Sequence, residues 1–373
     1  MKRLLALILG CALCTAHAKA EPMRDLTPMQ LAAEMGTGWN LGNSLEAMSK
    51  EGGKTASGET AWGNPVVTQE LMNAVKAAGF KTVRIPVAWK AHANADDMID
   101  PAWMARVAEV VGYARKAGLY VILNTHWDGG WAQPTYAHQR EATTRLARFW
   151  LQIARNFEEA DEHVVFAGTN EVMVEGDWGK PKPEYAAVQN GFNQAFVKAV
   201  RSTGGNNERR VLIVQGFNTN IDHTMEFFVM PKDTTPNRLM VEVHYYDPFN
   251  FTIDEKSKTW QWGAGATSKG LTAGWGDEAH TDAQFQKMKA KFVDSGVPVI
   301  LGEFGVIRRA SYAESERYRI DWNGYIARSA RAHGMVPVYW DNGYSAADHG
   351  MGLFDRKTGA QAYPELIKAI VKP

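Results

Sequence analysis

Two glutamates stand where runs of strand-forming residues stop. Glu171 comes shortly after the apolar run 164–166, and Glu303 comes shortly after the run 297–300. A carboxylate at the end of a strand is costly to bury without a partner, so it is commonly retained for chemistry. Two such carboxylates on different strands of one barrel are the minimum equipment for cleaving a glycosidic bond.

More polar and aromatic residues fall at or near predicted strand ends, and we group them with the glutamates as one candidate site: Asn43, Arg84, His126, Asn170, His244, Tyr246 and Trp340. Arg84 lies inside the apolar strand 83–87, where its charge needs a carboxylate partner. Each residue alone could serve a structural hydrogen bond inside the barrel, as buried histidines commonly do. The set together indicates a single site.

Strand and helix patterns alternate along the chain. The strand-like runs are 36–43, 82–89, 120–127, 164–171, 210–217, 239–247, 297–303 and 335–341. Helical patterns cover 68–78, 101–117, 142–158, 185–202, 281–295 and 312–333, with a weaker one at 223–229 and a last one at 364–371. Eight such units in order predict an α/β fold, a single (β/α)8 TIM barrel. A doubly wound open sheet would want a glycine-rich phosphate loop after its first strand, and that signal is absent.

The chain is longer than a plain barrel of about 250 residues. We place the excess in three loops that leave the carboxyl ends of strands, at 47–63, 173–184 and 248–280. Active sites of such barrels are built from loops at that end. No linker, repeat or low-complexity tract is evident, so residues 21–373 are interpreted as one catalytic domain with extended βα loops.

The first twenty residues have the pattern of an export signal. Lys2 and Arg3 precede a short apolar run at 4–13, and small residues suited to cleavage follow at 16–20. The run is too short to span a bilayer permanently, so no membrane insertion is expected after cleavage. The alternative is a buried core helix. Residues 1–20 are interpreted as a signal peptide of a secreted or periplasmic bacterial protein.

Composition limits the other possibilities. Both cysteines, Cys11 and Cys14, fall inside the predicted signal, so the mature chain has no disulfide and no cysteine ligand. Lysine plus arginine number 41 and aspartate plus glutamate number 41, a balance that favours neither nucleic acid nor an anionic membrane as partner. A monomer is expected.

The chain has thirteen tryptophans, and their placement is informative. Several lie in polar or glycine-rich stretches rather than in apolar periodic segments: Trp62, Trp131, Trp178, Trp260, Trp262 and Trp275. Flat indole faces suit the C–H faces of pyranose rings, although hydrophobic packing explains any single tryptophan equally well. The set predicts sugar subsites, with Trp262 and also Trp127 as candidate contacts.

At this point the sequence resembles glycoside hydrolase family 5, in its cellulase and endo-β-1,4-glucanase branch. The resemblance covers the mature chain and is carried by the segment 38–43, Arg84-Ile85-Pro86, His126-Trp127, Asn170-Glu171, His244-Tyr245-Tyr246, the segment 302–305 and Trp340. One departure is Val172, where the family commonly has proline. That difference indicates a divergent subfamily.

The resemblance implies a role for each residue. Glu171 would be the general acid and then the general base, and Glu303 the nucleophile of a retaining double displacement. Arg84 and Tyr246 would hold Glu303 ionised, and His244 would lie near the pair. His126, Asn170 and Trp340 would contact the sugar at the cleavage point, Trp340 as its stacking floor. No metal or organic cofactor is implied, and a β-glucan polysaccharide is the expected substrate.

Three alternatives stay open at this stage. Mannan, xyloglucan or mixed-linkage β-glucan could replace cellulose, because enzymes for these glycans share the catalytic set. A metal-dependent hydrolase could use His126, His244 and Glu303 as ligands, although closely spaced histidines on one strand are missing. A non-catalytic carbohydrate-binding barrel would need the tryptophans but not a costly charged cluster.

Overall fold

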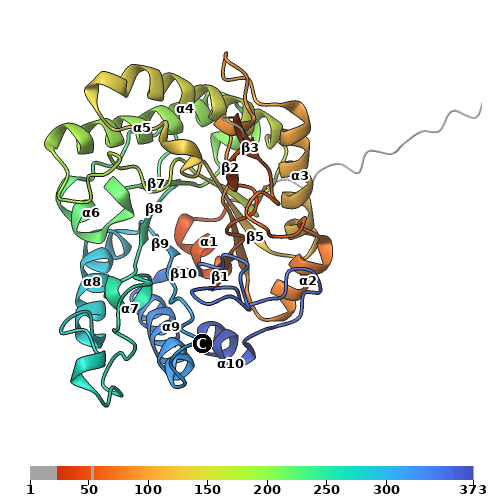
Figure 1. Cartoon of the computed structure of the whole chain (residues 1–373). Coiled ribbons are helices and arrows are strands. Elements are labelled where there is room, and N and C mark those ends of the chain that lie inside the picture. The colour runs from red at the N-terminus through yellow and green to blue at the C-terminus, as the bar shows by residue number, and fades with distance from the viewer. Residues whose placement is uncertain (1–22, 52–53, 373) are drawn as a thin grey trace, which may run out of the picture.

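The computed structural model describes residues 23–51 and 54–372 and contains a closed barrel of parallel strands (Figure 1). Going round the barrel, its strands follow the order β1, β10, β9, β8, β7, β6, β5 and β4. They span β1 Gly38–Asn40, β4 Thr82–Ile85, β5 Tyr120–Asn124, β6 Val164–Ala167, β7 Leu212–Gln215, β8 Leu239–His244, β9 Val299–Glu303 and β10 Met335–Tyr339. The predicted TIM barrel is confirmed, with each predicted strand run containing one barrel strand.

Helices follow the strands and surround the barrel (Figure 1). The α-helices are α1 Pro28–Met35, α2 Gln69–Ala77, α3 Pro101–Lys116, α4 Tyr136–Asn156, α5 Pro183–Arg201, α6 Ile221–Phe227, α7 Phe249–Thr252, α8 Glu278–Lys291, α9 Ser315–Ala332 and α10 Pro364–Val371. Short 3-10 turns are η1 Lys90–His92, η2 Asp128–Gly130, η3 Gly205–Glu208, η4 Phe217–Thr219, η5 Lys269–Leu271 and η6 Val293–Ser295. Local signals agree with these bounds; for example, Asp100 caps α3 by accepting from the amide of Ala102.

Alternate residues of each strand serve two different cores. The outward residues, such as Val83, Val121 and Val241, pack with the surrounding helices in one large cluster. The inward residues, such as Ile122 and Met240, form a second cluster inside the barrel. Because both strand faces are covered, the strands read as continuous apolar runs rather than as an alternation of apolar and polar residues.

The barrel interior changes from apolar to polar along its axis. At the amino ends of the strands, Leu31 and Met35 of α1 pack onto the apolar inward residues. Towards the carboxyl ends of the strands the inward positions become polar: Asn40, Arg84, Gln215, Glu242 and His244 are all buried there. Strand register pairs Asn40 with Arg84 and Gln215 with Glu242, so these side chains share a layer. That polar layer supports the candidate site.

Helices α1 and α7 and the strands β2 and β3 were not predicted. Helix α1 has only eight residues, too few to give a strong helical period in the sequence. The predicted loop 47–63 contains an antiparallel pair, β2 Met48–Glu51 and β3 Lys54–Ser57. Its polar composition lacks the alternation of a half-buried strand, so periodicity could not reveal it.

The predicted signal peptide lies outside the described residues. Among the residues that are described, no helix is long and apolar enough to cross a membrane.

Candidate active site

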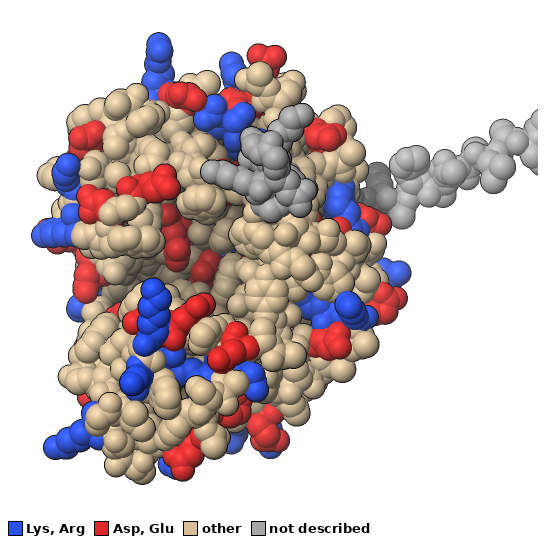
Figure 2. Space-filling model, in the orientation of Figure 1, with Lys and Arg blue, Asp and Glu red and all other residues tan. Residues whose placement is uncertain are grey.

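The two glutamates meet at the carboxyl-terminal end of the barrel. Glu303 is the last residue of β9, and Glu171 follows β6 closely. One carboxylate oxygen of each lies within 4.8 Å of the other. A retaining glycosidase needs carboxyl groups about 5–5.5 Å apart and an inverting one about 6.5–9.5 Å, so the spacing favours retention. Figure 2 shows acidic side chains gathered inside a hollow near the middle of the face in view.

Arg84 and Tyr246 both contact Glu303. Nη1 of Arg84 donates to Oε1 of Glu303 at 2.9 Å, and the Tyr246 hydroxyl donates to Oε2 at 3.1 Å. Burial nevertheless raises the pKa of Glu303, against the lowering effect of His244 and Arg84. The expected contacts are present, but they do not lower the pKa of Glu303 overall because desolvation dominates. Burial also raises the pKa of Tyr246 well above its ordinary value, so the phenol keeps its proton to donate.

His244 lies between three carboxylates. Its Nδ1 is 2.7 Å from Oε1 of Glu171 and 3.6 Å from Oε2 of Glu303, while Nε2 is 3.2 Å from Oε1 of Glu242. A shift in register between β8 and β9 brings His244 opposite Glu303, as bulges beside active sites commonly do. Burial opposes the charged imidazole, but Glu303 and the bonds to Glu171 and Glu242 raise the pKa of His244 to about 9.

Asn170 and His126 present fixed donors to the cleft. Nη2 of Arg84 donates to Oδ1 of Asn170 at 2.6 Å, which leaves the Asn170 amide nitrogen to donate elsewhere. Burial and the charges of Arg84 and His244 lower the pKa of His126 well below its ordinary value. His126 is therefore neutral. The Asn124 side-chain amide lies 3.1 Å from Nδ1 of His126 and can donate to it, which places the ring proton on Nε2.

Glu171 lies between two cavities that share its side chain and Trp178. The larger, of about 390 Å³, is lined by His126, Trp127 and Asn170, and the smaller, of about 250 Å³, is lined by residues that include Tyr246. A polymer can therefore lie on either side of Glu171. Such a cleft suits a chain cut internally.

Trp127 and Trp178 line the larger cavity. Trp127 and Trp178 are exposed by 53% and 78%. Trp340 is partly buried, and its ring plane lies 6° from that of His126 with the centroids 5.8 Å apart. Gly42 permits this placement, because a Cβ there would fall 2.9 Å from the Trp340 indole.

Trp262 was wrongly predicted as a sugar contact. It is buried, its indole N–H donates to the carbonyl of Gly276, and its ring packs against Tyr325. The glycine-rich setting that suggested an exposed indole reflects a compact loop folded around it. Trp262 therefore stabilises the loop after β8.

Asn43 is half-buried on the loop after β1, with a left-handed φ of 57°. Its amide donates to Glu46 and its carbonyl accepts from Asn64. In the barrel layer beneath, Asn40 is the residue that accepts from Arg84, at 3.0 Å.

Sequence reasoning missed Glu242 as well as Asn40. Glu242 is buried within β8, and its Oε1 forms an ion pair with Nε of Arg84 at 2.9 Å. Arg84 was expected to need one carboxylate and has two, Glu242 and Glu303. The signal that identified Arg84, a charge inside an apolar strand, was equally present at Glu242.

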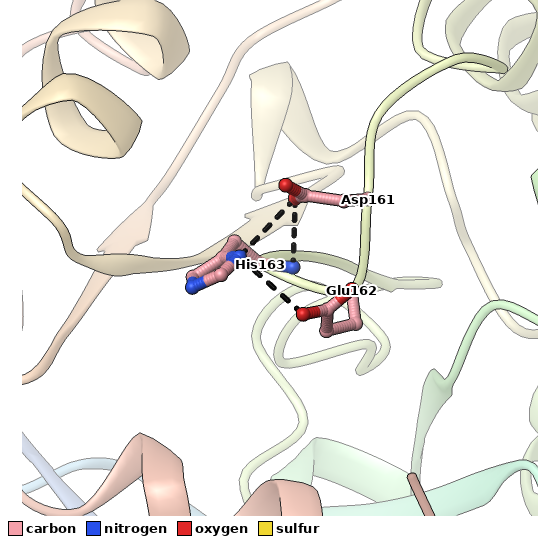
Figure 3. A group of neighbouring side chains, drawn as sticks. All are labelled: Asp161, Glu162 and His163. Carbon is pink, nitrogen blue, oxygen red and sulfur yellow. Dashed lines mark hydrogen bonds and ion pairs between the residues drawn. The ribbon is translucent and has the colours of Figure 1, made fainter. Parts of the chain in front are cut away.

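Two groups of acids and histidines in the described part of the chain have their ligand atoms close enough for a metal. One is Glu171, His244 and Glu303, and the other is Asp161, Glu162 and His163 (Figure 3). In the first, the imidazole has a carboxylate at each nitrogen, and its raised pKa favours the protonated form, which has no lone pair for a metal. His126, which the metal-dependent alternative requires, is not in either group.

The fold and site define a barrel hydrolase with two carboxylates that meet at the carboxyl ends of its strands. Residues 45–346 match the cellulase family, glycosyl hydrolase family 5, and the chain belongs to this family. It is 40% identical to endoglucanase A of Paenibacillus barcinonensis, over 96% of this chain and 93% of that one.

Solved structures of enzymes in this family are also similar to this chain. A Bacteroides ovatus family 5 xyloglucanase in complex with an XXXG heptasaccharide is 41% identical, with a TM-score of 0.89 over 94% of this chain and 77% of that one. A broad-specificity endoglucanase from Bacteroides salanitronis is 40% identical, with a TM-score of 0.87 over 94% of this chain and 96% of that one.

Proposed function

We propose that this protein is a retaining endo-β-1,4-glucanase that cleaves cellulose or related β-glucans. The observation that carries the proposal is the pairing of Glu171 and Glu303, with carboxylate oxygens within 4.8 Å, in a cleft that continues on both sides of Glu171. Membership of the cellulase family and similarity to endoglucanases support the same reaction.

In the first step Glu303 attacks the anomeric carbon and forms a glycosyl–enzyme ester. The bond to the leaving oxygen breaks, and that oxygen takes a proton from Glu171. Arg84 and Tyr246 orient the attacking carboxylate through their bonds to its two oxygens. The Asn170 amide donates toward the sugar, an interaction that strengthens as positive charge develops on the ring.

In the second step water cleaves the ester. Glu171, now a carboxylate, removes a proton from the water, and Glu303 leaves as the carboxylate. The Tyr246 hydroxyl and Arg84 stabilise the departing charge. The anomeric configuration is retained after two inversions. This route uses no metal or organic cofactor.

Xyloglucan is the second candidate substrate, because the Bacteroides ovatus relative named above is a xyloglucanase. The two candidates share the chemistry at Glu171 and Glu303. They differ in whether the cleft accepts side chains on the glucan. Mixed-linkage glucan and mannan are further candidate substrates, and the assay described next tests them as well.

The proposal is tested by measuring reducing ends released from carboxymethylcellulose, barley β-glucan, xyloglucan, glucomannan and xylan. Strong release from the first two with Glu303→Gln inactive supports the glucanase. Dominant release from xyloglucan moves the enzyme to the second candidate. Silence on all five, with tight binding in affinity gels, would favour a non-catalytic carbohydrate-binding protein.

We also propose export and a monomeric state. The tripartite pattern of residues 1–20 supports removal of a signal and secretion or delivery to the periplasm. Amino-terminal sequencing of the protein from culture medium and periplasm tests the first. Light scattering after size exclusion tests the second, and a mass of twice the chain would contradict it.

A further inference from the structure

Glu242 is a third carboxylate beside the catalytic pair, and the reaction as described does not use it. It is fully buried on β8, with its Oε1 placed 2.9 Å from Nε of Arg84 and 3.2 Å from Nε2 of His244. Through these two neighbours it reaches both glutamates, because Arg84 donates to Glu303 and His244 contacts Glu171.

The surroundings of Glu242 are built to hold a carboxylate there. Its second oxygen, Oε2, accepts from Nε2 of Gln215 at 2.7 Å. Gly302, the residue before the nucleophile, makes room for it, since a Cβ on Gly302 would fall 2.0 Å from Oε1 of Glu242. Burial opposes ionisation of Glu242, but Arg84 and the bond from His244 lower its pKa to about 2.

Neutral His244 would adopt one of two tautomers, and each would turn a lone pair toward a carboxyl group. A ring protonated only at Nδ1 would turn the Nε2 lone pair toward the Glu242 carboxylate. A ring protonated only at Nε2 would turn the Nδ1 lone pair toward Oε1 of Glu171, 2.7 Å away. In that second form the acid proton of Glu171 could sit between Oε1 and Nδ1, away from the substrate.

We propose that Glu242 is a positioning residue that holds His244 as the imidazolium, so that Oε1 of Glu171 always accepts from His244. The acid proton is then confined to Oε2 of Glu171, where it faces the leaving oxygen. This inference rests on the proposed hydrolase function.

The proton and electron balance of the step is unchanged by His244. The proton on Oε2 of Glu171 passes to the glycosidic oxygen, which keeps the electron pair of the broken bond, while Glu303 forms the new bond to carbon. His244 keeps both of its protons throughout. Its role is to decide which oxygen of Glu171 carries the proton.

The charges around His244 fit this assignment. Glu242 faces it from the same strand, Glu171 from the end of β6 and Glu303 from β9. The positive Arg84 of β4 and the neutral His126 beyond β5 are the other titratable groups near it, together with the protonated Tyr246. Three carboxylates and two cations leave one negative charge, which the acid proton of Glu171 neutralises.

The first test is nitrogen-15 NMR of the histidine side chains in wild-type enzyme and in Glu242→Gln, with His244→Asn used to assign the signal. We expect both ring nitrogens of His244 protonated at pH 7 in wild type, and its titration midpoint lowered by at least one pH unit in Glu242→Gln. A neutral His244 in wild type overturns the proposal without any variant. An unchanged midpoint in Glu242→Gln overturns it as well.

The second test is the pH profile of kcat/KM on a soluble β-glucan. In Glu242→Gln we expect a loss of roughly tenfold to a hundredfold at pH 7, since general acid catalysis contributes about 10²–10⁴-fold. The loss should shrink as pH falls and His244 regains its proton, which a merely structural defect would not do. A pH-independent loss contradicts the proposal.

Matched variants separate the causes. Glu162→Gln removes another buried carboxylate that pairs with an arginine, Arg24, at the other end of the barrel, and should leave the His244 signal and the pH profile unchanged. Glu242→Asp keeps the charge and should restore part of the midpoint. If wild type shows the imidazolium but hydrolyses no β-glucan, the proposed function fails while the assignment of Glu242 to His244 stands.

Discussion

Two clusters of acidic residues and histidine lie at opposite ends of β6. Asp161, Glu162 and His163 precede the strand, whereas Glu171 follows it and joins His244 and Glu303. Each cluster holds two carboxylates and one histidine. In the lower cluster, Asp161, Glu162 and His163, the histidine contacts both carboxylates (Figure 3). Each of these carboxylates also has an arginine of its own.

The partners make the clusters different. In the lower one Arg115 pairs with Asp161 and Arg24 with Glu162, while the His163 ring stacks on Tyr120. In the upper one a single arginine, Arg84, is shared by Glu303 and Glu242. The lower carboxylates are therefore compensated by arginines, whereas the upper cluster keeps one charge that a proton must neutralise, and it opens onto a cleft.

The largest expected effect comes from removing Glu303, the proposed nucleophile. Glu303→Gln should lower kcat on β-glucan by at least about 10⁴-fold, because residues that act as a unit lose nearly all of the rate when one is removed. Its counterpart Glu162→Gln should keep kcat and lose only about 1–2 kcal/mol of unfolding free energy. Reducing-end assays and urea titrations measure the two. Comparable activity loss in both variants would remove the distinction between the clusters.

The second effect separates the proposed acid, Glu171, from the proposed nucleophile, Glu303. Glu171→Gln should lower kcat on polysaccharide by roughly 10²–10⁴-fold, because it removes proton transfer to a poor leaving group. An aryl glycoside with a good leaving group needs little protonation, so its first step should be nearly unaffected, with the ester accumulating. Azide should then release it as a glycosyl azide of retained configuration. Product of inverted configuration would contradict the assignment.

The third effect is opposite pH dependence of stability. The folded pKa of His244 is about 9 against an ordinary 6.5, so its contribution is complete below pH 6.5 and is lost as pH rises to 9, by roughly 3 kcal/mol at most. The pKa of Asp161 is lowered, chiefly by its bond with His163, so its contribution is present above about pH 4 and is lost as pH falls.

Urea unfolding across pH measures both contributions. His244→Asn should flatten the loss between pH 6.5 and 9 and leave the acid side unchanged. Asp161→Asn should do the reverse. If His244→Asn left the free energy of unfolding unchanged on both the acid and the alkaline side, folding would not raise the pKa of His244.

Sequence reasoning reached the barrel and both glutamates because those features depend on local patterns. Apolar runs alternate with helical periods, and Glu171 and Glu303 end such runs. It missed Glu242 although a charge inside an apolar strand was visible there, because the pairing of Glu242 with Arg84, 158 positions away in the chain, leaves no local pattern. Nor could it separate exposed from buried tryptophans, because the loop that encloses Trp262 is held by contacts that have no sequence period.

The smallest expected effect concerns the difference between exposed and buried tryptophans. Trp127 is exposed in the cleft, so Trp127→Ala should raise KM for β-glucan by up to about tenfold through lost stacking of about 0.5–1.5 kcal/mol, with kcat nearly unchanged. Trp262→Ala should instead lower the thermal midpoint and leave KM unchanged, because the indole is buried against Tyr325. Cleft and core tryptophans thus separate by which quantity moves. A raised KM in Trp262→Ala at full stability would return that residue to the sugar-binding set.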